Sequence, residues 1–249
     1  MSLWGARPRR LTDRSTSTEI SEVFSSLQGE GPYLGVKQIF VRHGRCNMHC
    51  GYCDELEKMR EERFDIVTLE ELCSRIDALE MERGPHHSVS LTGGEPLAYA
   101  PFLRNLLPRL KEKGYRTYLE TNGTLPRELE SVLRWCDIIA MDLKPPTSTG
   151  DRAFWQEHRA FLKTGLAREL FVKVVVTPET GVEEIARCVD LVADVNPHVP
   201  FILQPLTAAG SGPDKAAMAL IESELFDIAK SRLSDVRAIA QMHKIWGVR

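Results

Sequence analysis

The chain has 249 residues, of which 43% are hydrophobic and 27% are charged. This balance is typical of a folded globular protein. The formal net charge of -3 argues against general nucleic-acid binding. No apolar run approaches the length of a membrane span. Six cysteines in a chain of this length do not make a disulfide scaffold, so we expect reduced thiols and a metal site.

The first 18 residues are rich in Arg, Ser and Thr, which is also typical of a transit peptide. Such a peptide should form an amphipathic helix, and Pro8 with the following Ser/Thr run opposes one. We therefore predict a flexible N-terminal tail over residues 1–18 and a single domain over residues 19–249. The absence of a signal sequence leads us to expect a cytoplasmic protein.

Short runs rich in β-branched residues alternate with helical patterns along the rest of the chain. Strands are predicted over residues 37–44, 87–96, 115–123, 136–146, 169–178 and 200–207, with one more within 236–249. Helices are predicted over residues 68–84, 101–114, 126–135, 151–165, 181–195 and 214–233. Thr68 is placed to cap the first helix, Gly114 to end the second, and Pro126 lies near the start of the third.

This alternation predicts parallel strands joined by right-handed crossover helices. Six or so such units favour an α/β fold of the partial (β/α)6 barrel type over a small doubly wound sheet. In both architectures the active edge is formed by the carboxyl ends of the strands. Because they all follow predicted strands, we expect one site to combine the cysteine loop with TGGEP (92–96), ETNG (120–123), MDLKPP (141–146) and QPL (204–206).

A Cys-x3-Cys-x2-Cys pattern within eight residues is formed by Cys46, Cys50 and Cys53. Structural zinc usually takes four ligands in two separated pairs, and here a fourth would have to come from His43, His49 or Asp54. A redox pair at Cys50 and Cys53 would leave Cys46 unexplained. Three thiolates can instead hold three corners of a 4Fe-4S cluster and leave one iron open for another ligand.

The spacing, with the aromatic Tyr52 before the last cysteine, resembles the signature of radical S-adenosylmethionine (SAM) enzymes. In that family SAM binds the open iron, and an electron from the cluster cleaves it to a 5'-deoxyadenosyl radical. A GGEP motif contacts the amino end of SAM, and later strand ends hold its ribose and adenine. The resemblance therefore implies these SAM-binding residues: Tyr52, Asp54, Gly93, Gly94, Glu95, Glu120, Asn122, Asp142, Lys144 and Gln204.

The flanks of the cysteine loop resemble a narrower family, the 7-carboxy-7-deazaguanine synthases of queuosine biosynthesis. The resemblance runs in order through SLQGEGPYLG (26–35), the strand with Arg42, LTGGEP, LETNG, DLKPP, LQPL and the ending QMHKIWGVR (241–249). It implies a carbon-nitrogen lyase that converts 6-carboxy-5,6,7,8-tetrahydropterin to 7-carboxy-7-deazaguanine. In that reaction ammonia is lost and SAM is regenerated.

The residue types suit such a substrate. A pterin presents an amino and ring N–H edge, for which Glu30 is a bidentate acceptor, while Gln28 can both donate and accept. The substrate carboxylate needs a cation, and Arg42 offers a fixed fork four residues before the cysteines. The competing interpretations are that QGEG (28–31) forms only a polar hairpin turn and that Arg42 is a solvated surface arginine. With the contacts that the family implies, the substrate-binding set is Leu27, Gln28, Gly29, Glu30, Arg42, Thr92, His243 and the terminal carboxylate of Arg249.

Glu55 departs from the resembled family, which usually has a threonine there that helps to bind magnesium. A carboxylate is an acceptable replacement, because Mg2+ prefers hard oxygen ligands. Glu55 could bind magnesium from a shifted position, pair with a nearby Lys or Arg, or repel a substrate carboxylate. The last outcome would imply a changed substrate.

The resemblance also implies an electron-donor protein such as a flavodoxin or ferredoxin, and it leaves a homodimer open. We expect neither a nucleic-acid nor a membrane partner. Two other functions stay open at this point. A radical SAM activase that generates a glycyl radical on a partner protein would share the cluster but need no pterin pocket. A non-enzymatic zinc-binding module would need a four-ligand metal site instead.

Overall fold

The computed structural model describes residues 13–54, 64–208, 210 and 212–248. Its centre is a nine-stranded sheet with the strand order β11-β8-β7-β6-β5-β4-β2-β1-β3. Every neighbouring pair from β11 to β2 is parallel, and β1 pairs antiparallel with both β2 and β3. The strands of this sheet are β1 (Ser17–Leu27), β2 (Lys37–His43), β3 (Asp65–Thr68), β4 (Ser88–Gly93), β5 (Thr117–Thr121), β6 (Ile138–Asp142), β7 (Glu169–Val176), β8 (Phe201–Pro205) and β11 (Val236–Ala238).

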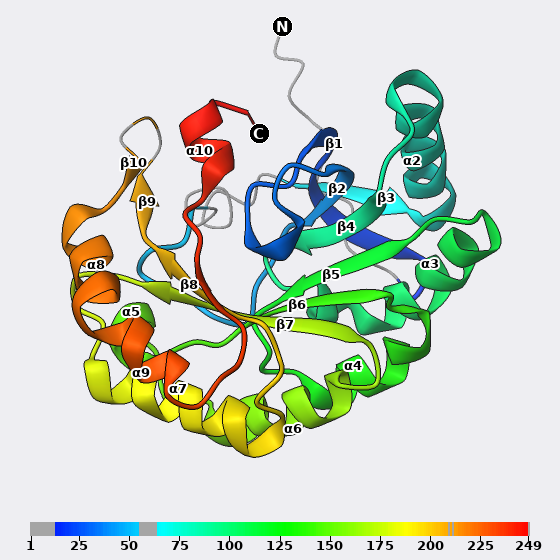
Figure 1. The fold of residues 1–249 in the computed structure, drawn as a ribbon. Helices are drawn as coiled ribbons and strands as arrows, with labels where there is room; N and C mark the ends of the chain where they lie inside the picture. Colours follow the sequence, from blue (N-terminus) through cyan, green and yellow to red (C-terminus); the bar gives the residue numbers. More distant parts are fainter. Residues whose placement is uncertain (1–12, 55–63, 209, 211, 249) are drawn as a thin grey trace, which may run out of the picture.

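Helices follow the outer face of the curved sheet, while the last helix, α10, crosses its open side toward β1 and β2 (Figure 1). The helices are α2 (Leu69–Arg83), α3 (Ala100–Glu112), α4 (Pro126–Val132), α5 (Pro146–Thr149), α6 (Trp155–Gly165), α7 (Val182–Val195), α8 (Lys215–Leu220), α9 (Phe226–Lys230) and α10 (Met242–Trp246). A small ribbon pairs β9 (Thr207–Ala208) with β10 (Gly212–Pro213). Within the described residues, no helix is long and apolar enough to cross a membrane.

The mostly parallel sheet with helices between its strands confirms the α/β fold predicted from the sequence. The sequence pattern does not predict β1, because its buried positions do not alternate regularly with exposed ones. β1 begins at Ser17, so Ser17 and Thr18 belong to the sheet rather than to the expected tail. Thr18 is fully buried and pairs with Val67 of β3, which the pattern also misses. Residues 1–12 lie outside the described residues.

Local signals set most helix ends where they are predicted. Thr68 caps α2 in a capping box, in which its hydroxyl accepts from the Glu71 amide at 3.3 Å and its own amide donates to the Glu71 carboxylate at 2.8 Å. Gly114 follows α3 with a positive φ of 83°, which a glycine adopts without strain. The helix predicted over residues 214–233 contains a π-helical stretch, Ile221–Leu225, between α8 and α9. After β11 the chain forms α10, where the sequence predicts no helix.

The two faces of the sheet have different roles. On β7, Val172, Val174 and Val176 point to the helices and belong to the main hydrophobic core. Side chains alternate along a strand, so Lys173 and Val175 point to the opposite face, where they line a cavity. The helix-covered face therefore stabilises the fold, and the open face carries the charged side chains.

His43, at the end of β2, makes stability depend on pH. Its side chain is 1% exposed, its Nδ1 lies 3.3 Å from the Thr18 hydroxyl, and its ring stacks on Tyr99. Burial lowers the pKa of His43 from 6.5 to about 3, so the folded chain keeps the ring neutral. We predict that the free energy of unfolding falls as the pH drops below 6.5 toward 3, because the unfolded chain takes up a proton that the folded chain does not.

Chemical denaturation of the apo protein, compared with the variant His43→Phe between about pH 7 and pH 5, measures this contribution. The variant should lose less stability on acidification than the wild type. His158, whose pKa burial also lowers, to about 4, is present in both proteins and cancels in the comparison. Parallel pH profiles for the two proteins would contradict the assignment to His43.

Candidate active site

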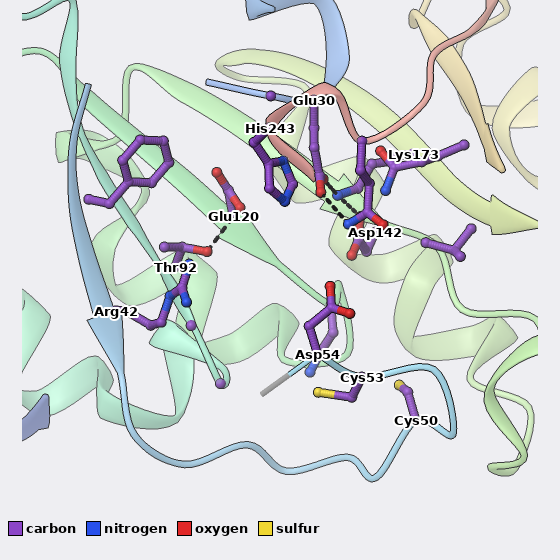
Figure 2. A pocket seen from close by; sticks show the side chains of 18 of the residues that line it. Glu30, Arg42, Cys50, Cys53, Asp54, Thr92, Glu120, Asp142, Lys173 and His243 are labelled. Carbon is purple, nitrogen blue, oxygen red and sulfur yellow. Dashed lines mark hydrogen bonds and ion pairs between the residues drawn. The ribbon is translucent and has the colours of Figure 1, made fainter. Parts of the chain in front are cut away.

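A cavity of about 520 Å³ opens at the carboxyl ends of the parallel strands (Figure 2). It contains nearly all of the site residues expected from the sequence, which come from six strands, the cysteine loop and the chain end. The expected residues that line it are Leu27, Gln28, Gly29, Glu30, Arg42, Cys46, Cys50, Tyr52, Cys53, Asp54, Thr92, Gly93, Gly94, Glu120, Asn122, Asp142, Lys144, Gln204 and His243. Glu55 and Arg249 lie outside the described residues.

The three clustered cysteines lie together at one end of this cavity. They pack in a small apolar cluster with Met48 and Phe154. The Cys46 sulfur accepts from the Met48 amide at 3.4 Å and from the Asn122 side-chain amide at 3.8 Å. Burial raises the pKa of the Cys46 thiol to about 12, so binding of a metal centre would displace its proton.

The donor set suits an iron-sulfur cluster better than a single ion. Within the described residues, no three His, Cys, Asp or Glu side chains converge closely enough to hold one metal ion. A four-iron cluster takes each thiolate on a separate iron, so its ligands need not converge on one point. The geometry therefore gives no support to the zinc-binding module.

Two glycines bring the TGGEP turn against the start of the cysteine loop. Gly93 has a φ of 105°, and a side chain there would lie 2.5 Å from the backbone N and O of His43. A side chain at Gly94 would collide with the Arg45 carbonyl and lie 2.9 Å from the Cys46 amide nitrogen. Both positions require glycine because backbone packs on backbone there.

Glu95, expected to contact SAM, does not line the cavity and is fully buried behind it. Its carboxylate accepts from the amides of Leu97 and Asn122 at 2.9 and 2.8 Å and from the Thr121 hydroxyl at 2.8 Å. Burial raises its pKa to about 7, although these hydrogen bonds act in the opposite direction. Glu95 thus holds the turn after β5 and acts on the cavity through Asn122.

Glu120, also expected to bind SAM, is hydrogen-bonded to residues expected to bind the substrate. Its oxygens accept from Gln28 Nε2 at 2.9 Å, from the Thr92 hydroxyl at 2.9 Å and from the Ser90 hydroxyl at 3.1 Å. Burial raises the pKa of Glu120, and the nearby charge of Glu30 raises it further.

A row of largely buried ion pairs crosses the cavity. Lys144 Nζ lies 2.8 Å from Asp142 and donates to the Tyr52 hydroxyl at 3.2 Å. On the other side of Asp142, Lys173 Nζ lies 3.2 Å from its second oxygen and pairs with Glu30. The sequence motifs do not indicate Lys173. The one feature that could have indicated it is its position as a lone lysine in a strand of buried valines.

The chain end closes the cavity through contacts that the sequence motifs do not reveal. Gln241 Nε2 donates to Glu30 at 2.8 Å. Lys244 Nζ pairs with Asp54 of the cysteine loop at 2.7 Å and donates to the Thr207 carbonyl at 2.7 Å. These bonds join α10 to the turn after β1, to the cysteine loop and to the segment after β8.

Two further expected residues line the cavity from opposite sides. Arg42 is 23% exposed at its side chain, lies 3.9 Å from Glu22 and stacks over the Phe24 ring. It is therefore held at the cavity edge rather than freely solvated. Gln204 is 1% exposed, and its Oε1 has no hydrogen-bond partner within the part of the chain that is described. An acceptor of this kind suits a ligand N–H or O–H donor.

The comparisons with known proteins agree with this site. The radical SAM superfamily model matches residues 40–194. A 7-carboxy-7-deazaguanine synthase of Geobacter sulfurreducens is 40% identical over 246 residues, covering 92% of this chain and 97% of the relative. One from Methanothermobacter thermautotrophicus is 32% identical over 253 residues, with the same coverage of 92% and 97%. The chain belongs to the 7-carboxy-7-deazaguanine synthase family of radical SAM proteins.

A crystal structure of QueE from Escherichia coli has a TM-score of 0.59 and 22% identity, and the match covers 90% of this chain and 94% of that one. A structure of Streptococcus suis SuiB bound to SAM has a TM-score of 0.54 and 18% identity, covering 79% and 45%. At these identities the likeness is evidence for the fold. Membership of the radical SAM superfamily confirms the expected cofactors, a 4Fe-4S cluster and SAM.

Gly29 sets how closely α10 approaches the cavity. A side chain at this position would lie 2.6 Å from the Cβ and backbone nitrogen of His243, and the Gly29 carbonyl accepts from the Met242 amide at 2.9 Å. We predict that Gly29→Ala displaces the chain end and exposes the bond after Lys244 to trypsin. Limited digestion followed by mass spectrometry should show cleavage there on the order of tenfold faster than in the wild type.

The control is Gly181→Ala, because a side chain at Gly181 would meet its nearest neighbours at an ordinary 3.7 Å. This variant should be cleaved at the wild-type rate. Unchanged cleavage of Gly29→Ala would mean that α10 does not need the close approach to Gly29.

Proposed function

We propose that this chain is a radical SAM lyase that converts 6-carboxy-5,6,7,8-tetrahydropterin to 7-carboxy-7-deazaguanine with loss of ammonia. One observation carries the assignment of substrate: the cysteine loop and the pterin-matched side chains Gln28, Glu30 and Arg42 line the same cavity. A glycyl-radical activase would need no such pocket. The family membership of the chain supports the same reaction, in which SAM is regenerated.

In this proposal Cys46, Cys50 and Cys53 would hold the 4Fe-4S cluster, which would supply one electron for the reductive cleavage of SAM. The residues proposed to bind SAM that line the cavity offer backbone groups, neutral polar side chains and charged side chains for its polar ends. They are Tyr52, Asp54, Gly93, Gly94, Asn122, Asp142, Lys144 and Gln204. Lys144 is buried and cationic, because Asp142 and its other neighbours raise its pKa above the ordinary value despite burial, so it suits a carboxylate.

The pterin would lie over the turn after β1. Burial alone would raise the pKa of Glu30, but the Lys173 charge lowers it to about 2, so the carboxylate is ionised at neutral pH. An ionised carboxylate accepts two N–H bonds at once, which matches the amino and ring N–H edge of a pterin. Arg42 at the opposite edge provides a guanidinium fork for the substrate carboxylate.

Several partners belong to the same proposal. An electron-donor protein such as a flavodoxin or ferredoxin would reduce the cluster, and a homodimer would agree with the family. The reducing conditions of the cytoplasm suit an iron-sulfur protein with free thiols. A magnesium ion is proposed near the substrate carboxylate, with Glu55 as its protein ligand.

Anaerobic turnover tests the function directly. Reconstituted protein with reductant, SAM and 6-carboxy-tetrahydropterin should form 7-carboxy-7-deazaguanine and ammonia. Chromatography and mass spectrometry measure the product. Cys50→Ala should lose the cluster absorption and all product. The matched control is Cys136→Ala, because Cys136 is a buried thiol outside the cavity and its loss should leave cluster and product in place. A cluster-loaded wild type that forms no deazapurine would refute the substrate assignment.

Glu55→Thr tests the magnesium ligand. If Glu55 binds the ion, threonine offers a shorter neutral ligand, so the concentration of Mg2+ needed for half-maximal turnover should change by several-fold. Initial rates measured over a range of Mg2+ concentrations give this value for both proteins. An identical metal response would argue against Glu55 as a ligand.

A further inference from the structure

Lys173 is a buried cation that contacts neither SAM nor the pterin in the proposed function. It lies on the cavity face of β7, is 8% exposed, and pairs with Glu30 and with Asp142 at 3.2 Å. Figure 2 shows its side chain among Glu30, Asp142 and His243. Burying an ammonium group is costly unless its ion pairs are kept, so this arrangement is held only while the carboxylates stay charged.

A second carboxylate, Glu120, shares this part of the cavity. Its hydrogen-bond donors are neutral groups, those of Gln28, Ser90 and Thr92. Within the described residues, no cation is in ion-pair contact with Glu120, whereas Glu30 has Lys173. The cavity thus holds two neighbouring carboxylates with unequal surroundings.

Unequal surroundings separate the protonation of two such groups. Lys173 lowers the pKa of Glu30 to about 2 against the effect of burial, and burial together with the Glu30 charge raises the pKa of Glu120. Other groups also face the pair. His243 and Gln241 face Glu30 from the chain end, and Asp142 faces Lys173 from β6, where its charge raises the pKa of Lys173 more than the charge of Glu30 does. Lys173 also lowers the pKa of Glu120, although among the described residues no ion pair joins the two.

We propose that Lys173 is a positioning residue for the substrate, which fixes Glu30 as a permanent anion and leaves Glu120 as the more readily protonated member of the pair. This inference rests on the proposed pterin substrate. The ionised Glu30 then accepts the amino and ring N–H bonds, while a protonated Glu120 can donate one O–H bond to a ring oxygen or nitrogen. The pair therefore offers a fixed acceptor at Glu30, and Glu120 adds a donor when it holds a proton.

The binding of 6-carboxypterin, a fluorescent oxidised analogue, tests this role without turnover. Fluorescence titration of the SAM-loaded, cluster-reconstituted protein between about pH 5.5 and pH 7.5 should give a flat affinity for the wild type, because Glu30 stays ionised throughout. Lys173→Met should bind on the order of tenfold more weakly at the acid end and recover as the pH rises, since Glu30 then takes up a proton.

Two control variants separate charge from packing. Lys173→Arg keeps a cation beside Glu30 and should restore the flat profile. Lys111→Met removes a cation that pairs with Asp137 outside the cavity, and its profile should also stay flat. If the affinity of Lys173→Met is lower than that of the wild type by the same factor at every pH, the proposal is overturned, because loss of a purely structural lysine would have this uniform effect.

The wild type and Glu30→Gln test the idea if Lys173→Met does not fold. A wild-type affinity that falls toward acid pH, with a fall that Glu30→Gln abolishes, would show that Glu30 is protonated despite Lys173 and would refute the proposal. A flat wild-type profile supports it. Turnover separates failure of the proposed function from failure of the role of Lys173. Absence of deazapurine product refutes the proposed function. Product formation together with parallel binding profiles refutes only the role of Lys173.

Discussion

The parallel register of the central strands is the constraint on which the site depends. Asp142 on β6 is the direct partner of Lys173 on β7, and Arg42 on β2 is the partner of Thr92 on β4. Because side chains alternate between the faces of a strand, a slip of one residue would turn either partner into the helix-covered core. The valines that alternate with Lys173 bury the other face and so hold this register. Core packing and site geometry are therefore set by the same pairing.

Much of this arrangement is predictable because its signals are local. The alternation of strands and helices predicts a parallel sheet, whose carboxyl ends meet at one edge, and the motifs that follow the strands do line one cavity. Thr68 and Gly114 end their helices as their side-chain chemistry predicts. The cysteine loop is equally local, since three thiols within eight residues need no knowledge of the fold to suggest a metal centre.

The features that the sequence does not reveal depend on contacts between distant parts of the chain. Glu30 and Lys173 are separated by 143 positions, and Glu30 and Gln241 by 211, so no periodicity or spacing connects them. Glu95 is the opposite case: its motif predicts a ligand contact, whereas in this structure its carboxylate accepts hydrogen bonds from Thr121 and Asn122 at the end of β5. β1 is missed because buried and exposed positions do not alternate regularly along this particular strand.

The buried charges also connect the two proposed ligand regions. Glu30, Lys173, Asp142 and Lys144 form a row of alternating sign, from the pterin-facing turn to the residues near the cysteines. Each charge is stabilised by its neighbours: loss of Lys173 would leave Glu30 without its cation, and loss of Asp142 would leave Lys144 without its anion. Asp142 is shared by both lysines. A ligand carboxylate that binds Lys144 therefore competes with Asp142 for that lysine, and the freed carboxylate oxygen can strengthen its contact with Lys173. In the proposed function, the SAM and pterin regions are therefore linked through the shared carboxylate of Asp142.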